Sequence, residues 1–368
     1  MTLPTSGNPI SFSQLRSEFG TDGNNTNGPV RIGQYRRDDS SYTSKSAGTF
    51  TNQPIDTGVP TSGTIAASNL HGKSLNVIVD YHSGSADEGG TRPEDARTRY
   101  TDGSASGNWT VIGGYKTPPS NSGGTKVKIN VNKGLGSQAV GENGVAICAL
   151  RTGTWDNNTI LSVDVGASGK IRGAGGDGGN GGDDGGGGGA GEEGNSALGI
   201  QYGGTTVNVA SGGQIICGYG GGGGGGGDFQ EDGFLFSDQE RYAGGGGGGG
   251  GAGIPAGAGG SEGSGNGGDA TAGGSGSAQA GGEQGGAGGD GGNNAGEAIG
   301  GEGGRGGDQE NAAGAGAGPG DGSGGALGAN GWAIRKASSS ITYTLNNSGT
   351  VTGDKASTST GGSGTTVD

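Results

Sequence analysis

The fold of this chain is decided by residues 173–194, GAGGDGGNGGDDGGGGGAGEEG, in which every third residue from Gly173 to Gly194 is glycine. Three residues per turn is the period of the extended left-handed polyproline II helix. A glycine stripe along such a helix lets a neighbouring backbone come within hydrogen-bonding distance, because no Cβ stands between the two chains. The stripe therefore predicts rods that pack side by side.

Glycine triplets recur further along the chain, but in a changed phase. They begin at residues 218, 244, 282 and 322, which is the pattern of short rods joined by turns. A collagen-like helix needs abundant proline, and Pro255 and Pro319 are the only prolines between residues 173 and 331.

The glycine-rich segment has too few apolar side chains to build an ordinary core. Residues 173–331 contain 72 glycines among 159 residues. Two outcomes are compatible with that composition: a disordered segment, or a sandwich of polyglycine helices joined by backbone hydrogen bonds that offset the loss of chain entropy. The regular glycine register favours the ordered sandwich, since a flexible linker needs no register.

Charge separates the glycine-rich segment from the rest of the chain. The segment carries 19 Asp and Glu against Arg241 and Arg305, a net charge of −17, whereas the whole chain has −14. Phosphate binding needs clustered Lys and Arg, so nucleic acid is not an expected partner. The acidic side chains are expected to keep a glycine-rich surface soluble, and we predict neither a metal site nor a cofactor. Cys148 and Cys217 are expected to be small buried hydrophobes, with a disulfide between them left open.

Alternating apolar residues before the glycine segment predict a small antiparallel β-domain over residues 74–172. A repeat then connects this domain to the glycine rods. Its three copies, 163–171, 207–215 and 343–351, share two apolar positions, a turn glycine and a further apolar position. We interpret each copy as a β-hairpin, and two of them run directly into glycine runs. The predicted fold class is therefore mainly β, with hairpins that lead into a polyglycine II sandwich and with little α-helix.

The N-terminal segment is internally duplicated. Leu3-Pro-Thr-Ser-Gly7 is followed by Ile10, and Val59-Pro-Thr-Ser-Gly63 is followed by Ile65. The first copy predicts a short helix with Ser11 or Ser13 as N-cap and with Leu15 and Phe19 one turn apart. So short a helix is marginal alone and is expected to need a partner surface or a second subunit. The expected domains are 1–73 for attachment, 74–172 for the β-domain, 173–332 for the rods and 333–368 for a terminal hairpin and tail.

The combination of a duplicated start, hairpins running into glycine stripes, and a glycine block near the C-terminus resembles tail fibre and tail-tip adhesin proteins of tailed bacteriophages. The resemblance is carried by LPTSGNPISFSQLRSEFG and VPTSGTIAASNLHGK, and by TILSVDVGASGKIRGAGGDGGNGG with TTVNVASGGQIICGYGGGGGGGG. It implies a polyglycine II sandwich whose connecting loops, exposed at one end, touch the host surface. The chain departs from the family pattern at its end, because residues 341–351 and a Ser/Thr/Gly tail follow the glycine block.

Non-glycine insertions between glycine runs are the candidate binding positions. The first is 228–242, DFQEDGFLFSDQERY, which lies between two runs of eight glycines and concentrates aromatic residues. These aromatics form either a plug that caps the rods or an exposed patch for a saccharide or an outer-membrane protein. Secondary candidates are 195–202, 254–255 and 309–311, and Trp332 is expected to pack against the last hairpin. The named candidate contact residues are Phe229, Phe234, Leu235, Phe236, Tyr242, Ile254 and Tyr202.

We therefore predict a virion protein that recognises a host cell-surface receptor and performs no chemistry. Adjacent carboxylates such as Glu192 and Glu193, on a glycine-rich segment, are not held at the spacing that glycoside hydrolysis needs. The start of the sequence lacks a signal-peptide pattern, so the protein is expected to be made in the host cytoplasm. Residues 1–73 are expected to bind other virion proteins and to hold a homotrimer. The alternative is an architectural protein of the capsid or tail that binds no receptor.

Overall fold

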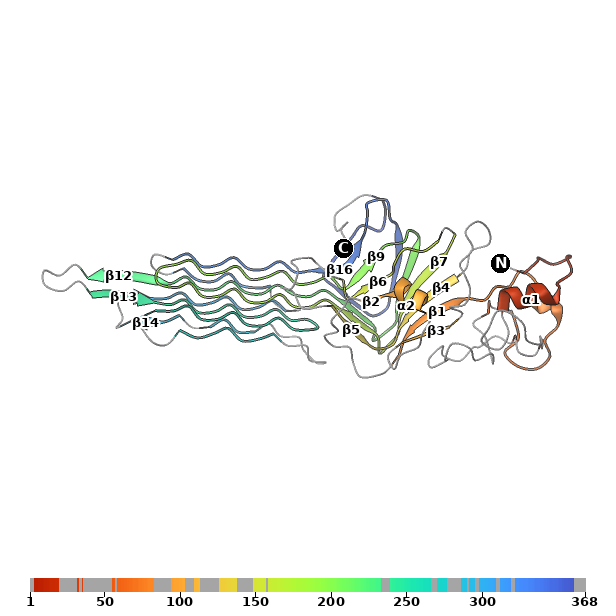
Figure 1. Cartoon of the computed structure of the whole chain (residues 1–368), viewed down its shortest axis with the longest axis horizontal. Coiled ribbons are helices and arrows are strands. Elements are labelled where there is room, and N and C mark those ends of the chain that lie inside the picture. The colour runs from red at the N-terminus through yellow and green to blue at the C-terminus, as the bar shows by residue number, and fades with distance from the viewer. Residues whose placement is uncertain are drawn as a thin grey trace.

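The computed structural model is an elongated, mainly β molecule, as the sequence predicts (Figure 1). An N-terminal body, a block of β-sheets and a long bundle of glycine rods follow one another along its axis. The structure describes residues 3–19, 32, 35, 55–56, 58–82, 94–102, 109–112, 126–137, 148–156, 158–232, 239–265, 270–276, 286–289, 291–294, 298–308, 312–318 and 322–360. Among these residues, no helix is long and apolar enough to cross a membrane.

The two N-terminal repeats pack against each other. Helix α1 (Phe12–Phe19) begins with a capping box, in which the Gln14 amide donates to Ser11 Oγ (3.1 Å) and the Ser11 amide donates to Gln14 Oε1 (2.7 Å). Leu15 and Phe19 are buried as expected, in a cluster that also includes residues of the second repeat, near the 3₁₀ helix η2 (Ala67–Leu70). The short helix therefore finds its partner surface within its own chain. The buried cluster contains Leu3, Leu15, Phe19, Tyr35, Ile55, Val59, Leu70 and Leu75.

Three sheets form the central block, and nearly all of their strand pairs are parallel. The six-stranded sheet has the order β17-β10-β7-β4-β1-β3, with β3 as its one antiparallel strand. Its strands are β1 (Val77–Tyr81), β3 (Trp109–Ile112), β4 (Lys126–Val131), β7 (Ile160–Val165), β10 (Thr205–Val209) and β17 (Tyr343–Asn347).

The other two sheets are parallel throughout. The four-stranded sheet contains β5 (Gly134–Gly136), β8 (Lys170–Arg172), β11 (Gln214–Ile216) and β18 (Thr350–Thr352). The five-stranded sheet contains β2 (Glu94–Asp95), β6 (Leu150–Arg151), β9 (Leu198–Ile200), β16 (Trp332–Lys336) and β19 (Asp354–Lys355). The second helix, α2 (Ala96–Asp102), follows β2.

The predicted hairpins and antiparallel domain are therefore wrong. Each repeat copy is one coil of a stacked structure, in which the chain turns from the six-stranded sheet into the four-stranded one. The turn glycines allow the coils to stack closely. A Cβ on Gly169 would lie 2.0 Å from the Val131 carbonyl oxygen of the preceding coil, and a Cβ on Gly349 would lie 2.3 Å from that of Gly213. The β4–β5 segment is a fourth copy, which the sequence repeat misses because its turn is two residues shorter.

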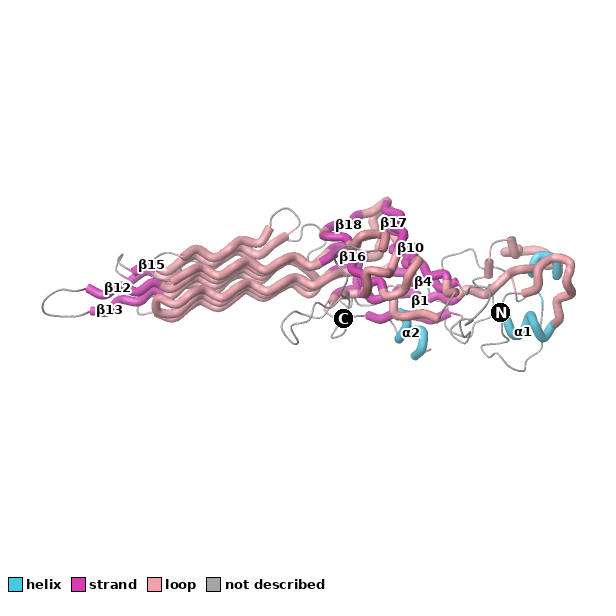
Figure 2. The backbone as a smooth tube through the Cα atoms, turned by 90° about the horizontal axis from the view of Figure 1, so that it is seen from above, coloured by secondary structure: helices cyan, strands magenta, loops and turns pink. Residues whose placement is uncertain are grey.

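Between the coils, the chain leaves the sheets and returns to them as extended segments that we call glycine rods (Figure 2). Successive rods run alternately away from the sheets and back, as the direction of their hydrogen-bonded pairing shows. The rods in the described part of the chain are 173–183, 186–195, 217–227, 243–253, 255–264, 270–276, 286–292, 300–308, 312–318 and 322–331.

Hydrogen bonds between rods advance by three residues at a time. The amides of Gly176, Gly179 and Gly182 donate to the carbonyls of Tyr219, Gly222 and Gly225, each at 2.8 Å. A β-strand would bond the same neighbour at every second residue, so this step is that of a three-residue helix. In the described residues, the glycine segment is thus an ordered bundle of hydrogen-bonded rods.

Two rods, 217–227 and 243–253, lie inside the bundle, and we call them the inner rods. Each exchanges backbone hydrogen bonds with six neighbouring rods. A Cβ on Gly222, Gly224 or Gly225 would lie about 2 Å from a neighbouring carbonyl oxygen. The two runs of eight consecutive glycines are therefore required, since every face of an inner rod meets another backbone.

Candidate functional site

The end of the bundle away from the sheets gathers five connections, and we call it the distal end. The connections lie between residues 183–186, 227–243, 265–270, 292–300 and 318–322. Backbone hydrogen bonds tie the first and last of them to the same residue, because the Gly227 amide donates to the Gly186 carbonyl and the Gly322 amide donates to the Gly227 carbonyl. Segments distant in sequence thus converge on one surface.

A hairpin projects from the distal end and continues the two inner rods (Figure 1). It consists of β12 (Asp228–Asp232) and β13 (Gln239–Ala243), paired antiparallel without a register shift. Phe229 and Tyr242 face each other across it, with ring centroids 5.0 Å apart. Both are half-buried, so each ring keeps an exposed part. The hairpin thus presents an aromatic pair on the best-supported rods of the bundle.

A second hairpin lies beside the first and adds an apolar side chain. It is formed by β14 (Asn293–Asn294) and β15 (Ala298–Ile299). The Ile299 amide donates to Asp228 Oδ2 at 2.9 Å, which fixes the two hairpins to each other. The Ile299 side chain is 47% exposed, so it adds apolar surface beside the aromatic pair.

Outer rods are held by a ladder of polar side chains. The Asp177, Asn180 and Asp183 side-chain oxygens accept from the amides of residues 258, 261 and 264 at 2.7, 3.0 and 2.5 Å. The backbone amide and the hydroxyl of Ser264 both donate to Asp183 Oδ1, and these two bonds hold the pKa of Asp183 below its ordinary value. Acidic and amide residues at every third position therefore align rod 255–264, which leads to the distal end.

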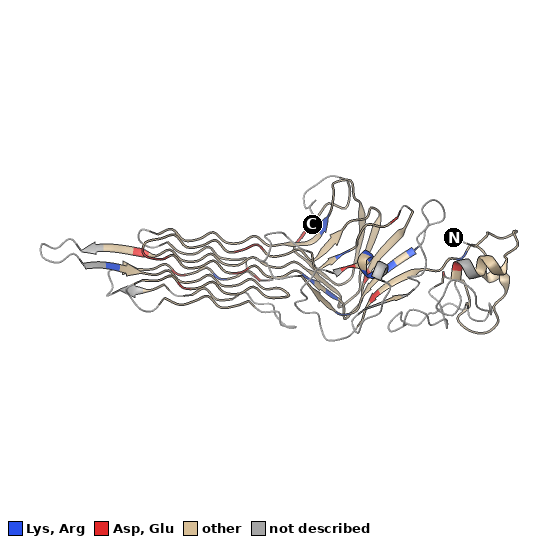
Figure 3. Ribbon diagram, in the orientation of Figure 1, with Lys and Arg blue, Asp and Glu red and all other residues tan. Residues whose placement is uncertain are grey.

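Lys and Arg side chains lie mainly in the β-sheets rather than in the rods (Figure 3).

The predicted contact residues divide into three groups. Phe229 and Tyr242 lie at the distal end as predicted, and Phe234, Leu235 and Phe236 lie outside the described residues. Ile254 and Tyr202 lie instead near the sheets. Ile254 is 2% exposed, and its carbonyl accepts from the Ser137 amide. Tyr202 packs against the main core and donates its hydroxyl to the Asp156 carbonyl. Neither can belong to the distal surface, because their connections join rods at the end near the sheets.

Asn195, in another of the secondary candidates, also belongs to that near end. Asn195 is buried and donates from Nδ2 to Ser137 Oγ at 3.1 Å, so it joins a rod to the sheets. Residues 309–311 lie outside the described residues. Trp332 begins β16, where the Arg335 guanidinium stands 5.8 Å from its ring centroid. The sequence analysis did not distinguish connections near the sheets from those at the distal end. Because successive rods run in opposite directions, numbering the rods along the chain would have shown which connections lie at which end.

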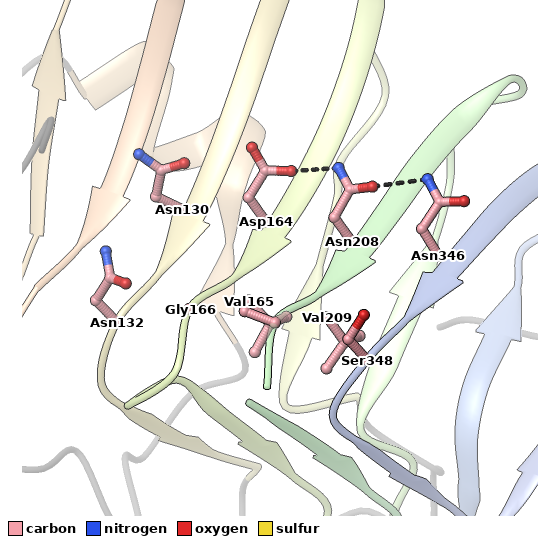
Figure 4. A pocket seen from close by; sticks show the side chains of 10 residues that line it. Asn130, Asn132, Asp164, Val165, Gly166, Asn208, Val209, Asn346 and Ser348 are labelled. Atoms are coloured by element: carbon pink, nitrogen blue, oxygen red, sulfur yellow. Dashed lines mark hydrogen bonds between the residues drawn. The ribbon is translucent and has the colours of Figure 1, made fainter. Parts of the chain in front are cut away.

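A shallow pocket on the outer face of the six-stranded sheet, crossed by a row of Asn and Asp side chains, was not predicted (Figure 4). Asn130, Asp164, Asn208 and Asn346 stand in register on neighbouring strands. Asn346 donates to Asn208 Oδ1 (2.8 Å), and Asn208 donates to Asp164 Oδ1 (2.5 Å). Their common position in the repeat is the sequence signal. Since these bonds run between coils, we assign the row to holding the coils together.

The row continues onto the neighbouring strand β1, where Asp80 has a carboxyl group with a shifted pKa. Asp80 is fully buried beside Asn130, and burial raises its pKa to about 6, against the lowering effects of the His82 charge and of hydrogen bonds from Asn130 and Asn132. In the described residues, no group of three or more His, Cys, Asp or Glu is placed to hold a metal ion.

No protein family model matches the chain, and no curated protein matches its sequence. Among solved structures, the chain is similar to the gp37–gp38 adhesin tip complex of the bacteriophage S16 long tail fibre. The TM-score is 0.36 and the identity 19%, over 80% of this chain and 88% of that chain.

Proposed function

We propose that the protein is a phage virion adhesin that binds a bacterial surface receptor through its distal end. The observation that carries the proposal is the convergence of five connections at one end of a rigid rod bundle, with Phe229, Tyr242 and Ile299 presented there. Binding surfaces are commonly loops positioned by a rigid scaffold, and aromatic residues are enriched at their energetic centres.

The backbone network makes the rods suited to carry such loops. Inner rods with six hydrogen-bonded neighbours cannot bend without breaking bonds, so changes in the loops leave the scaffold intact. The aromatic pair beside an Asp suits the apolar faces and hydroxyls of a saccharide, or the loops of an outer-membrane protein. The proposal assigns binding and no catalytic step.

The opposite end of the molecule supports attachment to the virion. The N-terminal body lies at the far end of the long axis from the distal hairpin (Figure 1). We propose that residues 1–73 bind another virion protein there, so that the distal end points toward the host.

A binding assay on bacterial cells tests the distal end. A Phe229→Ala/Tyr242→Ala variant should bind a susceptible strain at least about tenfold more weakly, because truncating a central aromatic residue costs roughly 2 kcal/mol. The matched control is Leu327→Ala, since Leu327 is 48% exposed but lies on the side of rod 322–331. Thermal unfolding checks that both variants keep the wild-type fold.

Wild-type binding by the double variant would overturn the assignment of the aromatic pair. Assembly into virions without binding to any strain that the phage infects would favour the architectural alternative, in which the aromatic residues only cap the rods.

A further inference from the structure

The stack of β-coils is covered at its first end and open at its last. Ile129, Val163 and Val207 occupy equivalent positions in successive coils and are all 0% exposed. Their counterpart in the last coil, Leu345, is only half-buried. The four-stranded sheet repeats this contrast, because Ile171 and Ile215 are buried whereas Val351 is half-buried. One more layer would complete the core.

The backbone of the last coil is open in the same way. β17 is the edge strand of its sheet. The Tyr343 amide faces away from β10, since it donates to the Thr358 carbonyl at 3.2 Å, and Leu345 and Asn347 share that side by strand alternation. β10 is the only strand of the described chain that pairs with β17, so this edge can accept another strand.

The chain carries a segment with the sequence of the missing strand. Gly364-Thr-Thr-Val-Asp368 differs from Gly204-Thr-Thr-Val-Asn208, which enters β10, only in its last residue. Asn208, the last residue of the second segment, pairs with Asp164 of β7, so the repeat already carries an Asp at this position. Aligned with β10, Val367 takes the inward position of Val207, and Thr366 takes the outward position of Thr206.

The spacing along the chain supports the same alignment. The first four strands of the five-stranded sheet along the chain, β2, β6, β9 and β16, are each followed by a strand of the six-stranded sheet. The intervals Leu150 to Ser162, Leu198 to Thr206 and Ile334 to Thr344 are 12, 8 and 10 residues between register-equivalent positions. Lys355 is the next position in this series, and Thr366 follows it by 11 residues.

We propose that residues 365–368 bind the open edge as a further parallel strand, with Val367 over Leu345 and Asp368 beside Asn346. The preceding segment already lies at this edge, because the Tyr343 amide donates to the Thr358 carbonyl (3.2 Å) and the Tyr343 hydroxyl donates to the Ala356 carbonyl (2.7 Å). On binding, the Tyr343 amide exchanges the Thr358 carbonyl for that of Gly364. The strand covers the last coil and blocks addition of a second copy at the edge.

Hydrogen exchange of the full chain, followed on a peptide spanning residues 343–349, tests the proposal. In the wild type, the outward amides of Leu345 and Asn347 should be protected. Val367→Asp places a carboxylate against Leu345, so it should speed their exchange at least about tenfold, which corresponds to 1.4 kcal/mol. The matched control, Thr366→Asp, carries the same new charge on the outward face and should exchange like the wild type.

Dilution separates the chain's own segment from a second copy. Protection that is unchanged over a hundredfold dilution supports binding within one chain. Protection that disappears on dilution would assign the edge to a second copy and overturn the proposal. Equal exchange in the wild type and Val367→Asp, whether fast or slow, would also overturn it.

Discussion

At the residue scale, the inner rods can be built only from residues without a side chain, as Gly224 shows. The Gly224 amide donates to the Gly189 carbonyl, and a Cβ on Gly224 would lie 1.9 Å from the Asn180 carbonyl oxygen. That oxygen belongs to a backbone that is itself hydrogen-bonded, so it cannot withdraw as the end of a flexible side chain could.

Gly224→Ala should therefore destabilise the protein strongly, although it adds only one methyl group. We expect a decrease of about 3 kcal/mol or more in the free energy of unfolding, since overpacking a tight interior forces backbone shifts. Urea unfolding followed by circular dichroism measures it. Gly203→Ala is the control, because its Cβ would meet open space. Equal stability of the two variants would show that the rods can separate at little cost.

Asp80 predicts a pH dependence of the opposite sign to that of most carboxylates. Its folded pKa of about 6 lies above the ordinary value of 3.8, so its contribution to stability is full below pH 3.8 and is lost as pH rises through 6. Asp80→Asn should raise the free energy of unfolding at pH 7.5 by up to about 3 kcal/mol and leave it little changed at pH 4. Thermal unfolding at the two pH values measures this difference, and an equal effect at both would contradict the buried charge as its cause.

At the element scale, the side-chain ladder replaces bonds that an outer rod cannot obtain from a neighbouring rod. Asp177 accepts the amide of residue 258, while the Ala258 carbonyl accepts from the Gly178 amide, so the two rods are bonded in both directions. This pattern explains why outer rods carry Asp or Asn where inner rods carry glycine.

Asp177→Ala should loosen one rod locally. The amide of residue 258 would lose its acceptor, so we expect its hydrogen exchange to accelerate severalfold while the amides of the inner rods stay protected. The amide of residue 261, bonded to Asn180, is an internal control in the same spectrum. Loss of protection throughout the bundle would show instead that the rods open as one unit.

The elements also show what sequence patterns can predict here. Glycine spacing indicated the rods, because the requirement for no Cβ is local and recurs at each contact. The Val-x-Val repeat located the strands, but it did not distinguish a hairpin from a stacked coil. That choice depends on the partner of each strand, and β7 pairs with β10 across two rods that leave and return. The distal surface was predicted only where aromatic residues marked it, as at Phe229 and Tyr242.

At the scale of the whole molecule, the two ends differ in construction. The distal end extends from rods held by backbone bonds, whereas the N-terminal body has a small apolar cluster and exposes Phe12 on α1 with 61% of its surface accessible. An exposed aromatic residue on a short helix suits a protein interface. In the proposed function, assembly and recognition therefore lie at opposite ends of one chain.

The predicted homotrimer can be tested at that exposed residue. If residues 1–73 hold a trimer through α1, Phe12→Asp should shift the sedimentation mass from three chains to one, because it puts charge in an apolar contact. The unfolding midpoint of the rods should stay unchanged, since Phe12 lies outside their hydrogen-bonded network. Ile160→Asp is the matched control, as Ile160 is 57% exposed at the start of β7. A monomeric wild type would contradict the trimer, and dissociation by Ile160→Asp alone would move the interface from the N-terminal body to the sheets.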